Sequence, residues 1–255
     1  MKIDLAGKTA LVTAASRGIG KSICQELAKN GAKVIAIARN RDKLEELLVT
    51  LENEEKHAII VLDLSKRENT KELKLLVDKL GLSPDIVVNN LGGNLGIVDP
   101  LSDYQNYEEV MYINLGVAIQ INKEFIPSML EKKYGRICHI SSISALENQG
   151  PPQYCAAKAA LNAYIRSIGR YVSKDNVIIT GVMPGAIYTE EGYWDEVIRN
   201  RPDHAEKFLK DRMAIGRFGD TAEVSALVAF LVSEHSSFMV GSVVLADGGQ
   251  GRTFQ

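Results

Sequence analysis

A tyrosine and a lysine four residues apart form the pair in this sequence whose types and spacing most directly suggest chemistry. They are Tyr154 and Lys158, in the stretch "QYCAAKAALNAYIRS". A separation of four places both side chains on one face of a helix. A free phenol has a pKa of about 10, and a neighbouring ammonium stabilises its phenolate form. The pair therefore predicts acid–base chemistry on a substrate oxygen, although this spacing by itself is structural more often than catalytic.

A turn that can hold a dinucleotide lies near the start of the chain. It reads "TAASRGIG" and runs from Thr13 to Gly20, between an apolar run and a helical stretch. Gly18 and Gly20 let the backbone approach a pyrophosphate, and the helix N-terminus supplies N–H donors. Ala14 replaces the usual glycine, and a positive φ there would cost about 1–2 kcal/mol. We therefore expect Ala14 to have a negative φ or a slightly shifted turn, with weaker cofactor binding.

The end of the second apolar run indicates which dinucleotide binds. An NAD-binding domain usually carries a carboxylate at this point, which binds the ribose 2′-hydroxyl. In "VIAIARN" the corresponding residue is Ala38. Arg39 follows it and Arg17 lies in the phosphate turn, so two guanidiniums can clamp a 2′-phosphate. The sequence therefore favours NADP(H) over NAD(H). The alternative is that both arginines simply face solvent.

These residues need a scaffold that brings strand ends together, and the apolar pattern predicts one. Short Val- and Ile-rich runs, typical of strands buried on both faces, alternate with segments of helical periodicity. The expected strands are Lys8–Thr13, Lys33–Ala38, Ala58–Leu62, Asp85–Asn89, Arg136–Ile140, Val177–Val182 and Ser242–Ala246. The expected helices are Gly18–Asn30, Arg41–Asn53, Lys66–Leu80, Tyr107–Lys132, Gln153–Ser173 and Thr221–Ser233. The pattern predicts a Rossmann-type, doubly wound, three-layer αβα fold with a mostly parallel seven-stranded sheet.

Composition limits the classes of function. With 255 residues, 45% of them hydrophobic, and a net charge of −2, we expect residues 1–255 to form a single domain. No Lys/Arg block indicates nucleic acid, no apolar stretch has the length of a membrane span, and the first residues do not resemble a signal peptide. We expect a cytoplasmic protein with neither nucleic-acid nor membrane partners. The three cysteines and four histidines are scattered, so no metal is expected.

Further motifs follow one another at the predicted strand ends. They are "VLDLS", "VVNNLGG", "MYINLG", "RICHISSIS", "VMPGAIYTE" and "GSVVLADGG". With the phosphate turn and the Tyr154–Lys158 pair, the chain from Leu5 to Gly249 resembles the short-chain dehydrogenase/reductase family of the single-domain type. The resemblance implies an oxidoreductase that transfers hydride between nicotinamide and a carbonyl or secondary alcohol. It also implies a homotetramer or homodimer.

The resemblance implies a role for each matching residue. Tyr154 matches the proton donor or acceptor, and Lys158 matches the residue that lowers the tyrosine pKa and holds the nicotinamide ribose. Ser142 resembles the hydroxyl that polarises the carbonyl, with Ser144 as a candidate helper, and Asn114 resembles the asparagine that ties a water to the lysine. The cofactor contacts that it implies are Thr13, Ser16, Arg17, Gly18, Ile19, Gly20, Arg39, Asp63, Leu64, Asn90, Gly92, Tyr154, Lys158, Pro184, Gly185, Ile187 and Thr189.

The sequence departs from the family pattern in three places, two of which concern cofactor binding and one of which concerns substrate binding. Ala14 in the phosphate turn and Leu91, where an alanine usually follows the paired asparagines, concern the fit of the cofactor. The loop from Ser142 to Tyr154 is one residue short and concerns access of the substrate.

The substrate is expected to lie between loops. Residues 190–213 lie in a long region without strand signals and are predicted to form a substrate lid. The predicted pocket residues are Asn94, Ser144, Gln149, Tyr188 and Trp194. The polar members favour a hydroxylated, sugar-like or acidic substrate, whereas the lid aromatics are equally explained by packing.

Three other functions share some of these motifs. A 3-oxoacyl-thioester (acyl-carrier-protein) reductase has all of them, but the charges of the lid are mixed in sign, whereas docking an acidic carrier favours a basic patch. A sugar epimerase or dehydratase typically has a longer C-terminal substrate region. A cofactor-sensing or scaffolding protein on the same fold is expected to have lost the tyrosine or the lysine, and both are present here.

Overall fold

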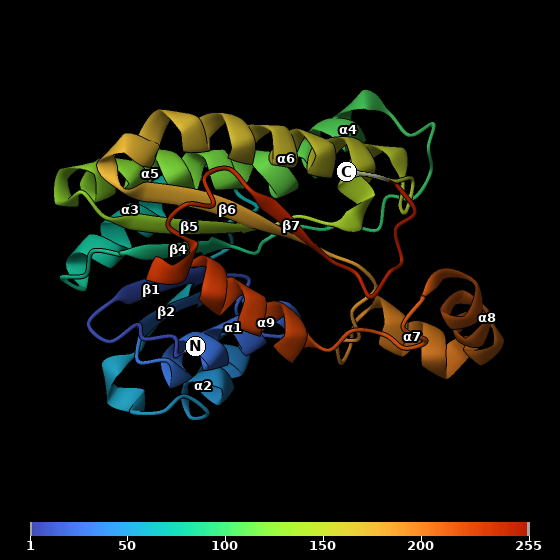
Figure 1. The fold of residues 1–255 in the computed structure, drawn as a ribbon, viewed down its shortest axis with the longest axis horizontal. Coiled ribbons are helices and arrows are strands. Elements are labelled where there is room, and N and C mark those ends of the chain that lie inside the picture. The colour runs from blue at the N-terminus through green and yellow to red at the C-terminus, as the bar shows by residue number, and fades with distance from the viewer. Residues whose placement is uncertain (1, 254–255) are drawn as a thin grey trace.

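A seven-stranded parallel sheet forms the centre of the protein in a computed structural model that describes residues 2–253 (Figure 1). Its strands are β1 (Thr9–Thr13), β2 (Lys33–Ala38), β3 (Ala58–Val61), β4 (Ile86–Asn89), β5 (Gly135–Ile140), β6 (Val177–Pro184) and β7 (Val243–Ala246). They lie in the order β3-β2-β1-β4-β5-β6-β7, and each neighbouring pair is parallel. The predicted doubly wound Rossmann-type fold is confirmed.

Helices cover both faces of the sheet. They are α1 (Gly18–Lys29), α2 (Arg41–Leu48), α3 (Asn69–Lys79), α4 (Tyr104–Met111), α5 (Val117–Lys132), α6 (Pro152–Val172), α7 (Tyr193–Asn200), α8 (Pro202–Arg212) and α9 (Thr221–Leu231). In Figure 1, α1, α2 and α9 lie on one face, α3, α5 and α6 lie on the other, and α7 and α8 lie beyond one end of the sheet. Among residues 2–253, no helix has both the length and the apolar composition needed to cross a bilayer.

Two of the predicted helices differ from the observed ones. The helix predicted for Arg41–Asn53 ends at Leu48, and Asn53 has a φ of 60°, in the left-handed region. The helix predicted for Tyr107–Lys132 is interrupted by a π-helical turn, η2 (Tyr112–Gly116), between α4 and α5. Periodicity did not reveal either feature, because both depend on a single turn of backbone.

Each strand contributes to two separate hydrophobic cores. Successive strand residues point to opposite faces, so Val12 packs with α1 and α9 whereas Leu11 packs with α5 and α6. The same alternation places Ala36 in the first core and Ile35 in the second. Because helices cover both faces, the strands are apolar at consecutive positions, which is the pattern that the sequence shows.

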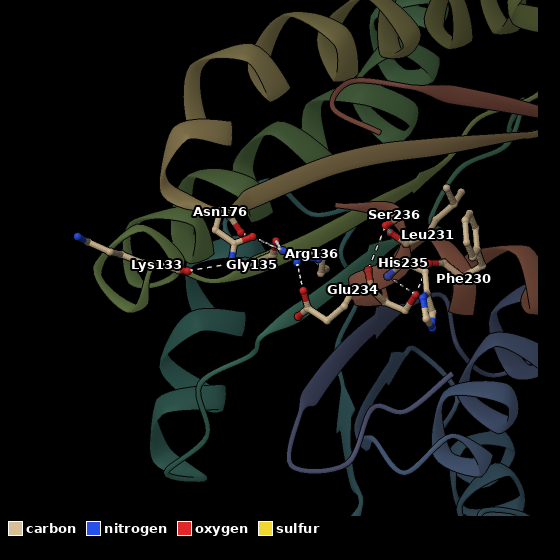
Figure 2. Close-up of polar contacts among 10 residues, drawn as sticks. Lys133, Gly135, Arg136, Asn176, Phe230, Leu231, Glu234, His235 and Ser236 are labelled. Carbon is tan, nitrogen blue, oxygen red and sulfur yellow. Dashed lines mark hydrogen bonds and ion pairs between the residues drawn. The ribbon is translucent and has the colours of Figure 1, made fainter. Parts of the chain in front are cut away.

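A buried guanidinium connects several segments at the amino end of β5. Arg136 is fully buried, and Figure 2 shows it between Asn176 and Glu234. Its Nη1 donates to the backbone oxygens of Gly135 and Asn176, both at 2.9 Å, and its Nη2 donates to Glu234 Oε2 at 2.8 Å. Its guanidinium carbon lies 4.6 Å from the ring centroid of Tyr134. Because a guanidinium stays protonated in proteins, these partners must compensate its charge in place.

This arrangement predicts that Glu234→Gln is costly although Glu234 itself is 63% exposed. Glu196 is a matched control because it is 51% exposed and pairs with Arg201, which is 49% exposed, whereas Arg136 is 0% exposed. We expect Glu234→Gln to lower the free energy of unfolding by about 1–3 kcal/mol. Glu196→Gln should lower it by less than about 1 kcal/mol. Urea denaturation measures both free energies. Equal losses would show that the burial of Arg136 does not increase the cost of removing its charged partner.

Candidate active site

Two adjoining cavities open at the carboxyl ends of the strands. The order of the strands reverses at β1, between β2 and β4, which is where ligands bind in open α/β sheets. One cavity, of about 440 Å³, is lined by residues that include Arg39 and Asp63. The other, of about 460 Å³, is lined by residues that include Tyr154 and Lys158. Both are lined by Ala14, Arg17 and Gly92, so they form one continuous cleft.

The phosphate turn is tighter than expected. Ala14 has a φ of 51°, so the expected negative φ is wrong. Its carbonyl oxygen accepts a hydrogen bond from Asn90 Nδ2 at 3.2 Å. A Cβ atom on Gly20 would lie only 2.2 Å from the same oxygen. The start of α1 therefore packs directly under the turn, and this contact holds Ala14 in a conformation that costs an alanine about 1–2 kcal/mol.

Thr13 and Asn90 brace this turn against β4. Thr13 Oγ1 accepts from the backbone N–H groups of Asn90 at 2.9 Å and Leu91 at 3.0 Å. Asn90 Nδ2 also donates to the Thr13 carbonyl oxygen at 3.1 Å. Thr13 is fully buried and lines neither cavity, so the structure places this predicted cofactor contact behind the cleft.

The other predicted cofactor contacts line the cleft. They are Ser16, Arg17, Gly18, Ile19, Gly20, Arg39, Asp63, Leu64, Asn90, Gly92, Tyr154, Lys158, Pro184, Gly185, Ile187 and Thr189. Burial alone would raise the pKa of the Asp63 carboxyl, but hydrogen bonds from Ser65 and the charge of Arg39 lower it overall. Asp63 is therefore a carboxylate at neutral pH, beside a cation.

Two charged residues of the cleft were not predicted. Lys43, in the first turn of α2, lines the cavity that contains Arg17 and Arg39, and so does Glu191. Glu191 forms an ion pair with Lys43, whose ammonium lowers the pKa of the carboxyl, and its backbone oxygen accepts from Arg17 Nη1 at 2.8 Å. The helix start after "VIAIARN" is the sequence signal that could have identified Lys43.

Three of the four predicted catalytic residues line the second cavity, and the fourth, Asn114, lies next to Gly92 in its wall. Ser142, which follows β5, and Tyr154, near the start of α6, both line it. Lys158, one turn further along α6, is buried and donates from Nζ to the Ile140 carbonyl oxygen at 2.8 Å. A Cβ on Gly92 would lie 2.6 Å from Asn114 Oδ1 and 3.0 Å from Lys158 Nζ. Asn114 and Lys158 therefore flank the same glycine.

The π-helical turn positions Asn114. Such turns are rare and occur frequently at functional sites. Asn114 Nδ2 donates to the backbone oxygens of Gly93 at 2.7 Å and Val110 at 2.8 Å, and its Oδ1 accepts from the Gly93 N–H at 3.0 Å. These bonds hold the Asn114 side chain against Gly93, in the loop that follows β4.

The pKa values of the catalytic pair differ from the expectation. Burial raises the pKa of the Tyr154 phenol, and a hydrogen bond with Ser142 only partly opposes this effect. Burial lowers the pKa of Lys158 from 10.5 to about 7. Lys158 Nζ lies 5.7 Å from the tyrosine ring centroid and donates to a carbonyl instead. The expected lowering of the Tyr154 pKa by Lys158 is therefore not found in the protein by itself, because desolvation of the phenol outweighs its hydrogen bond with Ser142.

A buried histidine behind the site does not take part in acid–base chemistry at neutral pH. His139 lies on β5 and is fully buried, and burial and then the charge of Lys158 lower its pKa to about 3. Its Nε2 is 3.3 Å from Asn122 Nδ2, and Asn122 also donates to the Tyr164 hydroxyl. This network joins β5 to α5 and α6 behind the catalytic residues.

A third cavity, of about 520 Å³, adjoins Ser142 and Tyr154. Four of the predicted pocket residues line it, namely Asn94, Ser144, Gln149 and Trp194. Tyr188 lies elsewhere: it lines neither this cavity nor the cleft, because its hydroxyl donates to Asp195 Oδ1 at 3.1 Å and anchors α7. Tyr193, His204 and Phe208 of the predicted lid also line this cavity, and so does Gln250, which was not predicted.

The lid aromatics pack on one another. The ring of Trp194 lies 4.3 Å from that of Phe208 and 4.6 Å from that of Phe218, centroid to centroid. Trp194 therefore joins α7 to α8 and also forms part of the cavity wall. The packing explanation of these aromatics and their place in the predicted pocket are compatible.

Comparisons with known proteins agree with this geometry. A family model described as short chain dehydrogenase matches residues 8–193. The 3-oxoacyl-[acyl-carrier-protein] reductase FabG of Rickettsia typhi is 33% identical over 248 residues, covering 97% of this chain and 98% of that protein. A 3-oxoacyl (acyl-carrier-protein) reductase from Agrobacterium tumefaciens C58, solved with NADP bound, has a TM-score of 0.90 at 28% identity, covering 97% and 96% of the two chains. The L-sorbose reductase from Gluconobacter frateurii, complexed with NADPH and L-sorbose, has a TM-score of 0.91 at 26% identity over 100% of both chains.

The fold and the comparisons together define the class of protein. The chain belongs to the short-chain dehydrogenase family. It is an oxidoreductase that acts on CH–OH and C=O groups.

The buried lysine predicts an unusual dependence of stability on pH. In the unfolded chain Lys158 has its ordinary pKa, and in the folded protein the value is about 7. Between these values the unfolded chain binds more protons, so the stability of the protein rises with pH from about 7 towards 10. Lys158→Met should therefore raise the free energy of unfolding by about 1–3 kcal/mol at pH 7 or below, and this gain should shrink towards pH 10. Thermal unfolding across this pH range measures it, with Lys123→Met at an exposed position of α5 as the control. A loss of stability at every pH would contradict the burial of an uncompensated cation.

Proposed function

We propose that this oxidoreductase uses NADP(H) to interconvert a carbonyl and a secondary alcohol on a small, polar substrate, with Tyr154, Ser142, Lys158 and Asn114 as its catalytic machinery. The observation that carries the proposal is that Ser142, Tyr154 and Lys158 line the cavity next to the phosphate turn, while Asn114 flanks Gly92 in the wall of that cavity. Residues held only for structural reasons would not need to gather at a cleft that suits a dinucleotide.

The cleft fits a dinucleotide. Gly18, with a φ of 53°, and Gly20 line the cleft at the start of α1, where the N–H groups of a helix N-terminus can bind a pyrophosphate. Asp63 lines the first cavity, at the nucleoside end, and Asn90, Ile187 and Thr189 line the second. The bound cofactor would supply the hydride.

The residues of the chain supply the proton and the orientation. The raised pKa keeps Tyr154 protonated at neutral pH, which suits a proton donor for carbonyl reduction. The Ser142 hydroxyl, next to Tyr154, would hold the same oxygen and stabilise its developing negative charge. Lys158 would return a proton to the phenol, and Asn114 would tie a water to the lysine, because both side chains flank Gly92.

Tyr154→Phe tests the proton donor. We expect a kcat lower by at least about 100-fold, because the proton-transfer group is lost, and an unchanged Kd for NADPH. Tyr171→Phe, at an exposed position of the same helix, is the control. Turnover by Tyr154→Phe close to that of the unmodified protein would remove the tyrosine from this role.

The adenosine end of the cleft supports a preference for NADP(H). Arg17, Arg39 and Lys43 all line this cavity, and Ala38 stands where a carboxylate would bind a ribose 2′-hydroxyl. The Agrobacterium and Gluconobacter structures contain NADP and NADPH, respectively. The three cations are the features of this chain that would meet a 2′-phosphate.

A double variant tests this preference. Ala38→Asp with Arg39→Ile should shift the ratio of kcat/KM for NADPH to that for NADH by about 100-fold towards NADH, because it removes a cation and adds a carboxylate for the 2′-hydroxyl. Arg41→Ile is the control, since Arg41 pairs with Glu45 and does not line the cleft. An unchanged ratio would show that this end of the cleft does not select the cofactor.

A second candidate activity is the reduction of 3-oxoacyl thioesters. The relatives from Rickettsia typhi and Pseudomonas aeruginosa, each 33% identical to this chain, carry this name. The two activities differ in substrate and share the catalytic residues, so kinetic comparison of acetoacetyl thioesters with small hydroxylated ketones separates them. NADPH binding without oxidation by any carbonyl compound would favour a sensor instead.

A further inference from the structure

The wall of the third cavity contains two glutamine amides whose orientation is set by a chain of hydrogen bonds. Gln250 Oε1 accepts from the Ala186 N–H at 2.7 Å, and Gln250 Nε2 donates to Gln149 Oε1 at 3.3 Å. Gln149 Nε2 then donates to Glu147 Oε2 at 2.9 Å. Each glutamine accepts through its amide oxygen and donates through its amide nitrogen, so neither amide can flip without breaking the chain. Each Nε2 keeps a second N–H that this chain does not use.

The C-terminal segment holds this chain in place. Glu147 Oε1 accepts from the backbone N–H groups of Arg252 and Thr253, the latter at 2.9 Å. Arg252 Nη2 donates to the Asp211 carbonyl oxygen, in the last turn of α8, at 2.8 Å. Residues 250–253 therefore link the loop after β5 to the lid helices, and Gln250 is only 4% exposed. The two amides are in place before a substrate binds.

The cavity is polar but carries no fixed charge. Its other polar lining residues include Asn94, Ser144 and His204, and no Lys, Arg, Asp or Glu is among the described residues that line it. A carboxylate or phosphate in this cavity would lose water without gaining a cation. An alkyl chain would cover amide N–H groups that then lack acceptors.

Aromatic rings also line this cavity. They belong to Tyr193 and Trp194 and lie 5.1 Å apart, edge to face. A cavity with both aromatic rings and polar amides suits a molecule that carries C–H groups and hydroxyls. The volume of about 520 Å³ is in the range of small-ligand pockets.

We infer that the part of the substrate held in this cavity is an uncharged, polyhydroxylated carbonyl compound or its alcohol, and that Gln149 and Gln250 determine this specificity by donating hydrogen bonds to its hydroxyl oxygens. The inference rests on the proposed function for the reaction itself and adds the substrate class. A site built to bind hydroxyls discriminates strongly against analogues that lack them, by about 10⁴-fold in favourable cases.

A panel of six-carbon substrates tests the class. The neutral ketohexoses fructose, sorbose, tagatose and psicose are compared with 5-ketogluconate, which adds a carboxylate, and with 2-hexanone, which lacks the hydroxyls. We expect kcat/KM with NADPH for the best ketohexose to exceed both others by at least about 100-fold. A better rate with 5-ketogluconate, 2-hexanone or an acetoacetyl thioester would overturn the inference and leave the oxidoreductase activity standing. No oxidation of NADPH by any of these compounds would count against the proposed function and the inference together.

Variants of the two glutamines test the mechanism. Gln149→Met should raise KM for the best ketohexose by about 10-fold or more, with little change for 2-hexanone and in the Kd for NADPH. Gln250→Leu should do the same, and the double variant should be little worse than either single variant, because the amides act as one unit. Gln25→Met, at a distant site on α1, is the control.

Gln149 lies on a half-buried loop, and its replacement leaves the bond between Ala186 and Gln250 intact, so this variant remains informative if Gln250→Leu fails to fold. Equal loss for the ketohexose and 2-hexanone would show a structural role and overturn the assignment.

Discussion

The site depends on a buried ammonium group that is anchored where a strand ends. Lys158 Nζ donates to the carbonyl oxygen of Ile140, the last residue of β5, and this bond fixes the position of α6 along the sheet. Tyr154 lies one turn earlier on α6, so the same contact places the phenol beside Ser142. The cost is the desolvation of a lysine, and it explains why the pKa of Lys158 falls to about 7.

Tight backbone packing at the neighbouring strand end complements this anchor. Ala14 adopts a left-handed conformation because α1 begins directly beneath it, and Asn90 holds its carbonyl oxygen. Asn114 similarly donates both N–H groups of its amide to the backbone oxygens of Gly93 and Val110, and it accepts from the Gly93 N–H. Polar side chains around the cleft thus form hydrogen bonds to the backbone at the ends of β1, β4 and β5. Strain at one residue is tolerated because several others determine the position of the backbone.

Charged side chains have different environments at the two ends of the sheet. At the end opposite the cleft, the buried Arg136 has acceptors for its guanidinium and joins β5, β6 and the turn after α9. At the carboxyl ends, Arg17, Arg39 and Lys43 line an open cavity, where Glu191 pairs with Lys43 and accepts a hydrogen bond from Arg17. The charges at that end therefore lie at the edge of a cavity, whereas the charge of Arg136 is buried inside the protein.

The sequence by itself determined the sheet and the order of its elements, and it pointed to Ser142, Tyr154 and Lys158, which line the cleft. These features rest on local patterns: apolar runs that require two covered faces, a spacing of four on a helix, and motifs at strand ends. It failed where the outcome depends on how the folded chain packs. The φ of Ala14 depends on its contacts with Gly20 and Asn90, and the raised pKa of Tyr154 depends on how much water the fold excludes. Only the tertiary structure brought Gln250 to Gln149 and Lys43 to Glu191, because side chains a hundred or more residues apart come together only when the chain has folded.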